Sequence, residues 1–136
     1  MNFIIDNWPL LLILIISIVF VLKFNAKKDD YEIGIKFNDL INLNNSGLVL
    51  LVDIRNNSDF NSSHIIGSVN YQNSVEEIKS VLIKNKRKTV VIVCETGKNS
   101  AALAQKLINI KNSYKIKFLI GGIANWKVEG LPVLNK

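Results

Sequence analysis

The chain has a single cysteine, Cys94, and this thiol is the side chain best suited to covalent chemistry. One cysteine alone excludes an internal disulfide and any CxxC redox or zinc-ribbon site. Cys94 is therefore either a small buried apolar residue or a reactive nucleophile. The sequence around it decides between these two roles.

The residues on either side of Cys94 favour the reactive role. Thr89–Val93 consists of β-branched residues and predicts a buried strand, and a helical pattern begins at Ser100. A loop between a strand's carboxyl end and a helix N-terminus gathers free backbone N–H groups, which favour an anion. A thiolate at Cys94 is stabilised there, and Gly97 lets the loop curl around the sulfur. We expect this sulfur to be reachable from solvent, because a sulfur packed away from solvent would count against group transfer.

The elements that must position this loop alternate between strands and helices. Apolar spacing predicts helices over residues 36–45, 74–83, 100–110 and 123–128, and the second of these opens with a capping box, Ser74-x-x-Glu77. Two apolar runs, over 49–54 with a break at Asp53 and over 89–93, predict buried strands, and residues 117–120 are interpreted as another strand. This alternation predicts a parallel α/β domain, with the functional loops at the carboxyl ends of the strands.

Four short blocks follow one another between residues 35 and 134. They are Leu51-Val-Asp-Ile-Arg55, Phe60 with Ser63-His-Ile-Ile-Gly-Ser-Val-Asn70, Cys94-Glu-Thr-Gly-Lys-Asn-Ser100, and Leu119-Ile-Gly-Gly122 with Trp126 and Gly130-Leu-Pro132. In order and spacing they resemble the rhodanese family, whose patterns are D-x-R, F-x-x-G-H-I-x-G-A-x-N, C-x-x-G-x-R-S and L-x-G-G…W…G-x-P. The resemblance covers nearly all of the predicted domain.

This resemblance implies a fold, a reaction and a site. The fold is a three-layer α/β arrangement with a central, mostly parallel five-stranded sheet flanked by helices. The reaction is sulfur transfer through a persulfide on Cys94, from a small donor anion such as thiosulfate to a thiol or protein acceptor, with cyanide as acceptor in an assay. No metal and no organic cofactor is required. The substrate-binding loop consists of Glu95, Thr96, Gly97, Lys98, Asn99 and Ser100.

Other residues of the four blocks are interpreted as structural support. We expect Asp53 and Arg55 to form ion pairs or hydrogen bonds that fix the strand end. The single histidine is expected in a structural turn, because a preformed thiolate needs no base. The remaining supports are expected to serve core packing and turns, and the full set is Asp53, Arg55, His64, Gly122 and Trp126.

The cysteine loop departs from the family pattern at one charged position. Asn99 stands where many members carry arginine, so the loop has lost a fixed cation. Lys98 replaces that charge as a flexible point charge and not as a bidentate fork, so weak thiosulfate binding is expected. Ser63 also replaces the glycine that usually precedes the histidine, a change that we regard as tolerable.

Two alternatives to sulfur transfer differ in what they require of the loop. A phosphatase or arsenate reductase on the same fold needs C-x5-R, and Ser100 occupies the arginine position, so the bidentate partner of an oxyanion is missing. A non-catalytic rhodanese-like module that binds a partner or senses persulfide at a membrane needs only an intact cysteine loop. We favour the enzyme and retain this module as the alternative.

The N-terminal segment is strongly apolar. Trp8–Leu22 carries no charge and is followed by Lys23. With Lys23 reaching the interface, this run predicts a single-pass transmembrane helix. The predicted organisation is an anchor with juxtamembrane lysines over 1–28, including part of a polar linker over 23–30, and a rhodanese-like domain over 29–136. A cleaved signal peptide fits less well, because no positive charge precedes the apolar run.

The charges that flank the apolar segment also predict its location. Lysines follow it and Asp6 precedes it, so we expect the inner (cytoplasmic) membrane, with the N-terminus outside and the domain in the cytoplasm. The net charge of +6 does not indicate nucleic-acid binding. The cluster of Lys84, Lys86, Arg87 and Lys88 lacks interleaved aromatic residues and is interpreted as a solvated turn, so no nucleic-acid partner is expected.

Overall fold

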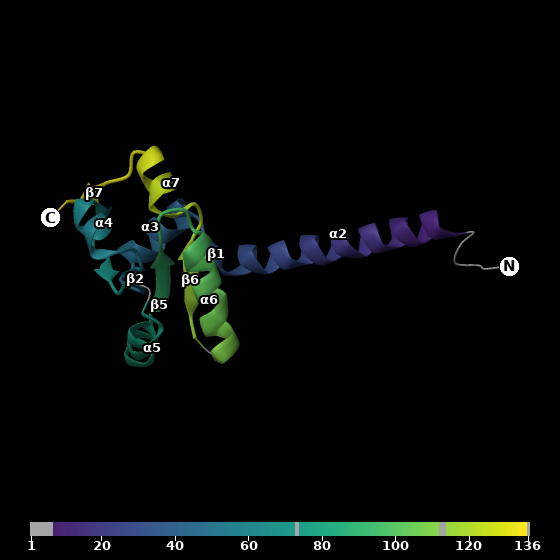
Figure 1. The fold of residues 1–136 in the computed structure, drawn as a ribbon. Coiled ribbons are helices and arrows are strands. Elements are labelled where there is room, and N and C mark those ends of the chain that lie inside the picture. Colours follow the sequence, from purple (N-terminus) through teal and green to yellow (C-terminus); the bar gives the residue numbers. More distant parts are fainter. Residues whose placement is uncertain (1–6, 73, 112–113, 136) are drawn as a thin grey trace. The chain divides into compact units, whose positions relative to one another are not determined.

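The computed structural model describes residues 7–72, 74–111 and 114–135 (Figure 1), with the backbone alone for 24–31. The chain divides into two compact units, residues 1–32 and residues 33–136.

Where the structure describes the first unit, it forms one long helix, α2 (Trp8–Ile33), whose last residue belongs to the second unit. Residues 23–30 were expected to form a polar linker, and this expectation is wrong, because the helix continues through them. The physical reason is that no proline or glycine occurs between Leu10 and Ile33, so nothing interrupts the backbone hydrogen bonds. Pro9 is tolerated because it lies in the first turn, where its missing N–H has no helical partner.

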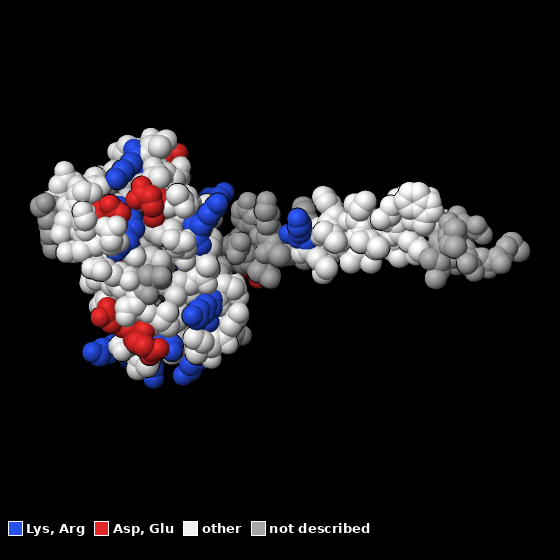
Figure 2. All heavy atoms as spheres, in the orientation of Figure 1, with Lys and Arg blue, Asp and Glu red and all other residues white. Residues whose placement is uncertain are grey.

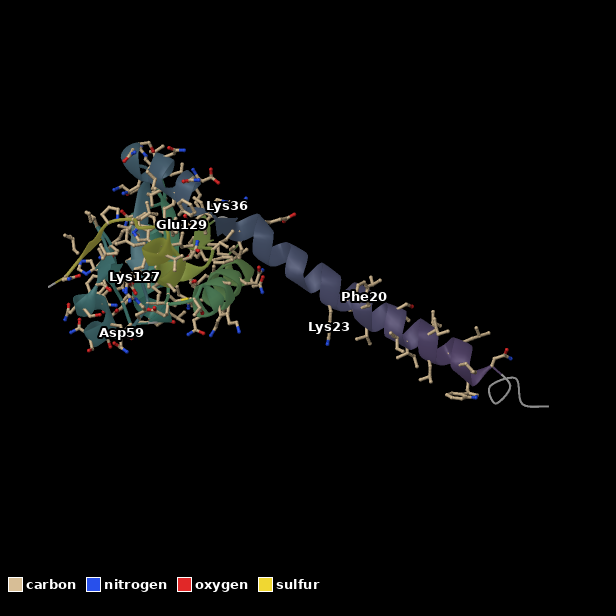
Figure 3. All side chains as sticks on the ribbon, turned by 90° about the horizontal axis from the view of Figure 1, so that it is seen from above. Phe20, Lys23, Lys36, Asp59, Lys127 and Glu129 are labelled. Carbon is tan, nitrogen blue, oxygen red and sulfur yellow. The ribbon has the colours of Figure 1, made fainter. Side chains whose placement is uncertain are left out.

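The apolar side chains of α2 project into solvent around the helix. Large hydrophobic residues from Trp8 to Leu22 are exposed, and Phe20 reaches 69 % exposure. Figure 3 shows these side chains along the helix, with Phe20 and Lys23 labelled. On the face drawn in Figure 2, the apolar segment is white and is followed by a blue basic side chain.

The structure does not support the predicted transmembrane helix. Within the described residues, no helix combines the length and the apolarity needed to cross a membrane. The uninterrupted apolar run ends at Lys23, short of the roughly 20 residues that a bilayer core requires.

The second unit contains a five-stranded sheet in the order β1-β6-β5-β2-β4, and all four neighbouring pairs are parallel. A separate antiparallel pair joins β3 to β7. The strands are β1 (Gly34–Ile35), β2 (Val49–Asp53), β3 (His64–Ile65), β4 (Val69–Asn70), β5 (Thr89–Val93), β6 (Ile116–Leu119) and β7 (Val133–Leu134). The helices of this unit are α3 (Phe37–Asn45), α4 (Asn57–Ser62), α5 (Val75–Lys84), α6 (Lys98–Ile110) and α7 (Gly122–Val128).

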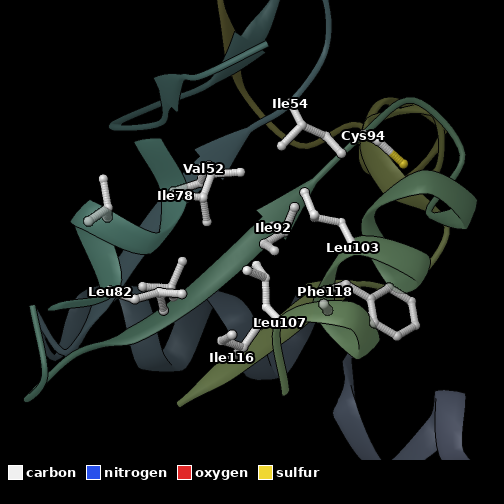
Figure 4. Packing of buried hydrophobic residues seen from close by; sticks show 13 residues of the cluster. Val52, Ile54, Ile78, Leu82, Ile92, Cys94, Leu103, Leu107, Ile116 and Phe118 are labelled. Atoms are coloured by element: carbon white, nitrogen blue, oxygen red, sulfur yellow. The ribbon is translucent and has the colours of Figure 1, made fainter. Parts of the chain in front are cut away.

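Alternate residues of the central strands point to opposite faces, so each face of the sheet has its own apolar core. Helices α5 and α6 cover one face, and Figure 4 shows Ile78 and Leu82 of α5 and Leu103 and Leu107 of α6 packed over β5. Cys94 belongs to this cluster. Helices α3 and α7, together with β3, cover the other face. The domain is therefore the expected α/β fold with a parallel central sheet flanked by helices.

Each helix and strand predicted in the domain occurs within two residues of its predicted ends. The predicted cap at Ser74 also forms, since its side chain accepts from the N–H of Glu77 at 3.4 Å. The elements that were not predicted are β1, α4, β3, β4 and β7. These strands are two residues long and α4 has six residues, which is too short for apolar periodicity to be seen.

The packing of α5 can be tested with two isoleucines on the same helix. Ile78 is fully buried, whereas Ile83 is 55 % exposed. Ile78→Ala should lower the free energy of unfolding in urea by about 2–5 kcal/mol, because it leaves a cavity in the core. The same change at Ile83 should alter it by no more than about 0.5 kcal/mol. Equal effects at the two positions would contradict this description of the core.

Candidate active site

Cys94 follows the last residue of β5, and three polar groups of the next loop approach its sulfur. The N–H of Gly97 lies 3.1 Å from Sγ, and the N–H of Ser100 lies 3.4 Å from it. The hydroxyl Oγ of Ser100 lies 3.2 Å from Sγ and 3.1 Å from the carbonyl oxygen of Gly97. Because backbone N–H groups converge on one sulfur, the loop can hold negative charge at that atom.

The burial of this sulfur differs from what we expected. Cys94 is only 4 % exposed, and the sequence predicted a sulfur open to solvent. The physical reason is the curl of the loop itself, which places its amides around Sγ, while Ser100 behind it is fully buried. The exposed residues of the loop are Glu95, Thr96, Lys98 and Asn99.

The curl depends on the backbone of Gly97. This residue precedes α6 with φ +90°, a left-handed conformation that glycine adopts without strain. A Cβ at this position would also lie 3.1 Å from the backbone nitrogen of Gly121. Gly97 therefore provides both the turn of the loop and its close contact with the segment before α7.

Helix α7 holds the loop from the opposite side. The N–H of Ile123 donates to the carbonyl oxygen of Cys94, and the N–H of Ala124 donates to that of Glu95, both at 3.0 Å. At Gly122, with φ +61°, a Cβ would lie closer than 3.0 Å to both carbonyl oxygens. Because these two carbonyl groups point toward α7, the N–H groups that follow in the loop, those of Gly97 and Ser100, face the sulfur.

Arg55 connects the end of β2 to the cysteine loop. Its guanidinium contacts the Asp53 carboxylate in three places, with Nη2 at 2.8 Å from Oδ2 and Nε at 3.1 Å from both oxygens. Nη2 also donates to the carbonyl oxygen of Ser63 at 2.7 Å, and Nη1 contacts Oε2 of Glu95 at 3.2 Å. One side chain therefore joins β2, the turn before β3 and the residue next to Cys94.

The charge of Arg55 is held by its partners. Burial lowers the pKa of the guanidinium, but the hydrogen bonds and charges of Asp53 and Glu95 outweigh burial and raise it above its ordinary value. Arg55 and Asp53 are 5 % and 1 % exposed at their side chains, whereas the Glu95 side chain is 55 % exposed. Removing one partner of such a buried pair is strongly destabilising, because the other charge is left uncompensated.

The remaining predicted supports lie in structural contacts. The ring of His64 stacks on that of Phe60 with centroids 4.0 Å apart, and its Nδ1 lies 2.8 Å from the Phe60 carbonyl oxygen. Trp126 of α7 belongs to the same apolar core as Leu40 of α3, and its Nε1 donates to the carbonyl oxygen of Pro132 at 3.0 Å. Within the part of the chain that the structure describes, these hydrogen bonds and the ring contact are made with Phe60 and Pro132, so both side chains support the fold around the loop.

Sequence reasoning did not assign a role to Asn70. Its Nδ2 donates to the carbonyl oxygens of Asp53 and Arg55, at 3.1 and 2.7 Å, so it fixes the backbone that carries the arginine. The one available signal was its place at the end of the second block.

Among the described residues, no cluster of histidine, cysteine and carboxylate side chains could hold a metal ion.

The contact between α7 and the loop can be tested with two glycines. Gly122 and Gly130 both have positive φ, but a Cβ meets no atom within 4 Å at Gly130. Both alanine variants therefore carry backbone strain, and Gly122→Ala should lose about 1–3 kcal/mol more free energy of unfolding in urea, because its Cβ must displace the loop. Equal losses would show that the loop tolerates a side chain at Gly122.

Solved structures share this fold over most of the domain. A rhodanese-related protein from Thermoplasma volcanium is 26 % identical, with a TM-score of 0.62 over 76 % of this chain and 98 % of its own. Thiosulfate sulfurtransferase from Pseudomonas aeruginosa matches with a TM-score of 0.67 and 16 % identity, over 75 % of this chain and 20 % of its own. A Rhodopseudomonas palustris protein of unknown function, described as a possible tyrosine phosphatase, matches at 22 % identity and a TM-score of 0.65, over 79 % and 89 %. The last two structures are less than 25 % identical to this chain, so their similarity concerns the fold alone.

Sequence comparisons extend the relationship from the fold to a family. A TBC domain-containing protein kinase-like protein from Gallus gallus is 38 % identical over 93 residues, which are 61 % of this chain. The chain spans about a tenth of the length of that relative. The model of the rhodanese-like domain matches residues 36–129, which include the cysteine loop, Arg55 and the contact with α7. The chain therefore belongs to the family of rhodanese-like domains.

Proposed function

We propose that this chain is a sulfurtransferase that carries a sulfane sulfur as a persulfide on Cys94. The observation that carries this proposal is the convergence of the Gly97 and Ser100 N–H groups on Sγ of Cys94. These groups stabilise a thiolate before the reaction and the negative charge of the persulfide after it. Family membership supports the proposal, because the residues that match the family model include this loop.

The reaction proceeds in two displacements. The Cys94 thiolate attacks the outer sulfur of a donor such as thiosulfate, the S–S bond of the donor breaks, and sulfite leaves with the bonding electrons. An acceptor thiolate or cyanide then attacks the outer sulfur of the Cys94 persulfide, and the Cys94 thiolate is released. Division into two steps implies ping-pong kinetics. No metal or organic cofactor takes part.

The burial of Cys94 sets a condition on this mechanism. Because Cys94 is only 4 % exposed, a donor reaches the sulfur only when the residues packed around Cys94 move. The same burial favours the second candidate function, a module that holds a persulfide for sensing or partner binding without turnover, because a shielded sulfur exchanges slowly.

Turnover and persulfide storage are separated by one pair of measurements on the full chain. The wild-type chain should form thiocyanate from thiosulfate and cyanide, and Cys94→Ala should abolish this activity. Mass spectrometry should find a gain of about 32 Da that is lost on reduction and absent from Cys94→Ala. Equal rates in the two proteins would eliminate the enzyme, and a persulfide without turnover would establish the second candidate.

We also propose that the apolar segment of α2 attaches the chain to the inner membrane, with the rhodanese-like domain on the cytoplasmic side. This proposal rests on the exposed hydrophobic side chains between Trp8 and Leu22, since so large an apolar surface is unstable in water. The lysines that follow the segment support the orientation.

The attachment is tested by fractionation of cells that produce the full chain. The protein should stay with membranes after an alkaline wash, and Ile15→Lys should release it, because a charge is added to the apolar segment. Ile83→Lys, at an exposed position of α5, serves as the control and should leave the chain in the membrane fraction. An impermeant amine reagent should label the domain only after permeabilisation. Release of the wild-type chain, or labelling in intact cells, would overturn the proposal.

A further inference from the structure

The carboxylate of Glu95 is fixed at the rim of the Cys94 loop. Its Oε2 lies 3.2 Å from Nη1 of Arg55, which is itself held by Asp53 and by the carbonyl oxygen of Ser63. The backbone of Glu95 is also fixed, because its carbonyl oxygen accepts from Ala124. With its side chain 55 % exposed, this carboxylate faces solvent at the residue that follows the nucleophile in the chain.

The formal charges of the side chains in the loop and in its ion pairs sum to zero. Arg55 contributes one positive charge, which is shared between the carboxylates of Asp53 and Glu95, so this trio carries one net negative charge. Within residues 94–100 the remaining charged side chain is Lys98, which is exposed and has no ion pair among the described residues. The charged side chains therefore give a dianion that approaches Sγ no net attraction, because one fixed carboxylate offsets one mobile ammonium group.

We infer that Glu95 is a specificity-determining residue that makes this site select sulfane-sulfur donors of low charge, such as persulfides and thiosulfonates with a single negative charge, over dianions. This inference rests on the proposed sulfurtransferase function and names its donor class. The fixed position of Glu95 matters, because a freely moving carboxylate would turn away from an incoming anion, whereas Arg55 holds this one in place at the residue next to Cys94.

Two donors of nearly the same shape differ by one charge. Thiosulfate is a dianion, and methanethiosulfonate replaces one of its oxygens with a methyl group and is a monoanion. With either donor the Cys94 thiolate attacks the outer sulfur and forms a Cys94 persulfide anion. The S–S bond breaks, and sulfite or methanesulfinate leaves with the electron pair. Cyanide then accepts the sulfur as thiocyanate, so one assay follows both donors.

The experiment measures kcat/KM of the full chain for both donors, in the wild type and in Glu95→Gln. Glutamine keeps an oxygen that accepts from Arg55 and removes the charge. At low ionic strength the substitution should raise kcat/KM about tenfold for thiosulfate and about threefold for methanethiosulfonate, because the repulsion doubles with the charge of the donor. The preference for methanethiosulfonate should therefore fall about threefold. High salt should remove most of this change, since Glu95 is exposed.

Glu129→Gln is the matched control, because it removes the same charge from an exposed position beyond the end of α7. It should leave the ratio between the two donors unchanged. An unchanged ratio in Glu95→Gln, or an equal change in Glu129→Gln, would overturn the inference while thiocyanate formation still upholds the sulfurtransferase. Absence of thiocyanate from the wild type with both donors would instead overturn the sulfurtransferase itself.

Discussion

The backbone of Gly122 passes so close to the carbonyl oxygens of Cys94 and Glu95 that no side chain fits between them. Two N–H groups of α7 take these carbonyls as acceptors. Because the first peptide units of the loop are turned toward α7, its later N–H groups, from Gly97 and Ser100, are directed at the sulfur. The geometry of the backbone thus sets the environment of Cys94. That geometry depends on few of the side chains around the sulfur.

The positive charge next to this loop comes from a buried side chain. Arg55 is buried, and such a cation is stable only with partners, which it finds in Asp53, Glu95 and a carbonyl oxygen. Since these partners come from different segments, the ion pairs that stabilise the domain also fix the electrostatic field beside the sulfur. In this domain the stability of the fold and the charge of the site depend on the same guanidinium group.

The sequence predicted the helices and strands that line the core, because runs such as Thr89–Val93 and the spacing in 74–83 report burial directly. The position of Cys94 at a strand end was also predictable from the chain alone. Its low exposure was not, since shielding arises from the curl of the loop and its contact with α7. Contacts between distant segments, such as Arg55 with Glu95 and Asn70 with the end of β2, leave no periodic signal.

The two outer strands of the sheet, β1 and β4, each contain only two residues. A parallel sheet with long outer strands would present a row of unpaired N–H and C=O groups to which a strand of another molecule could add. Here the longer strands β2, β5 and β6 are enclosed between these short ones. The architecture therefore offers little template for edge-to-edge aggregation, a property of value to a domain whose central strand β5 consists of β-branched residues.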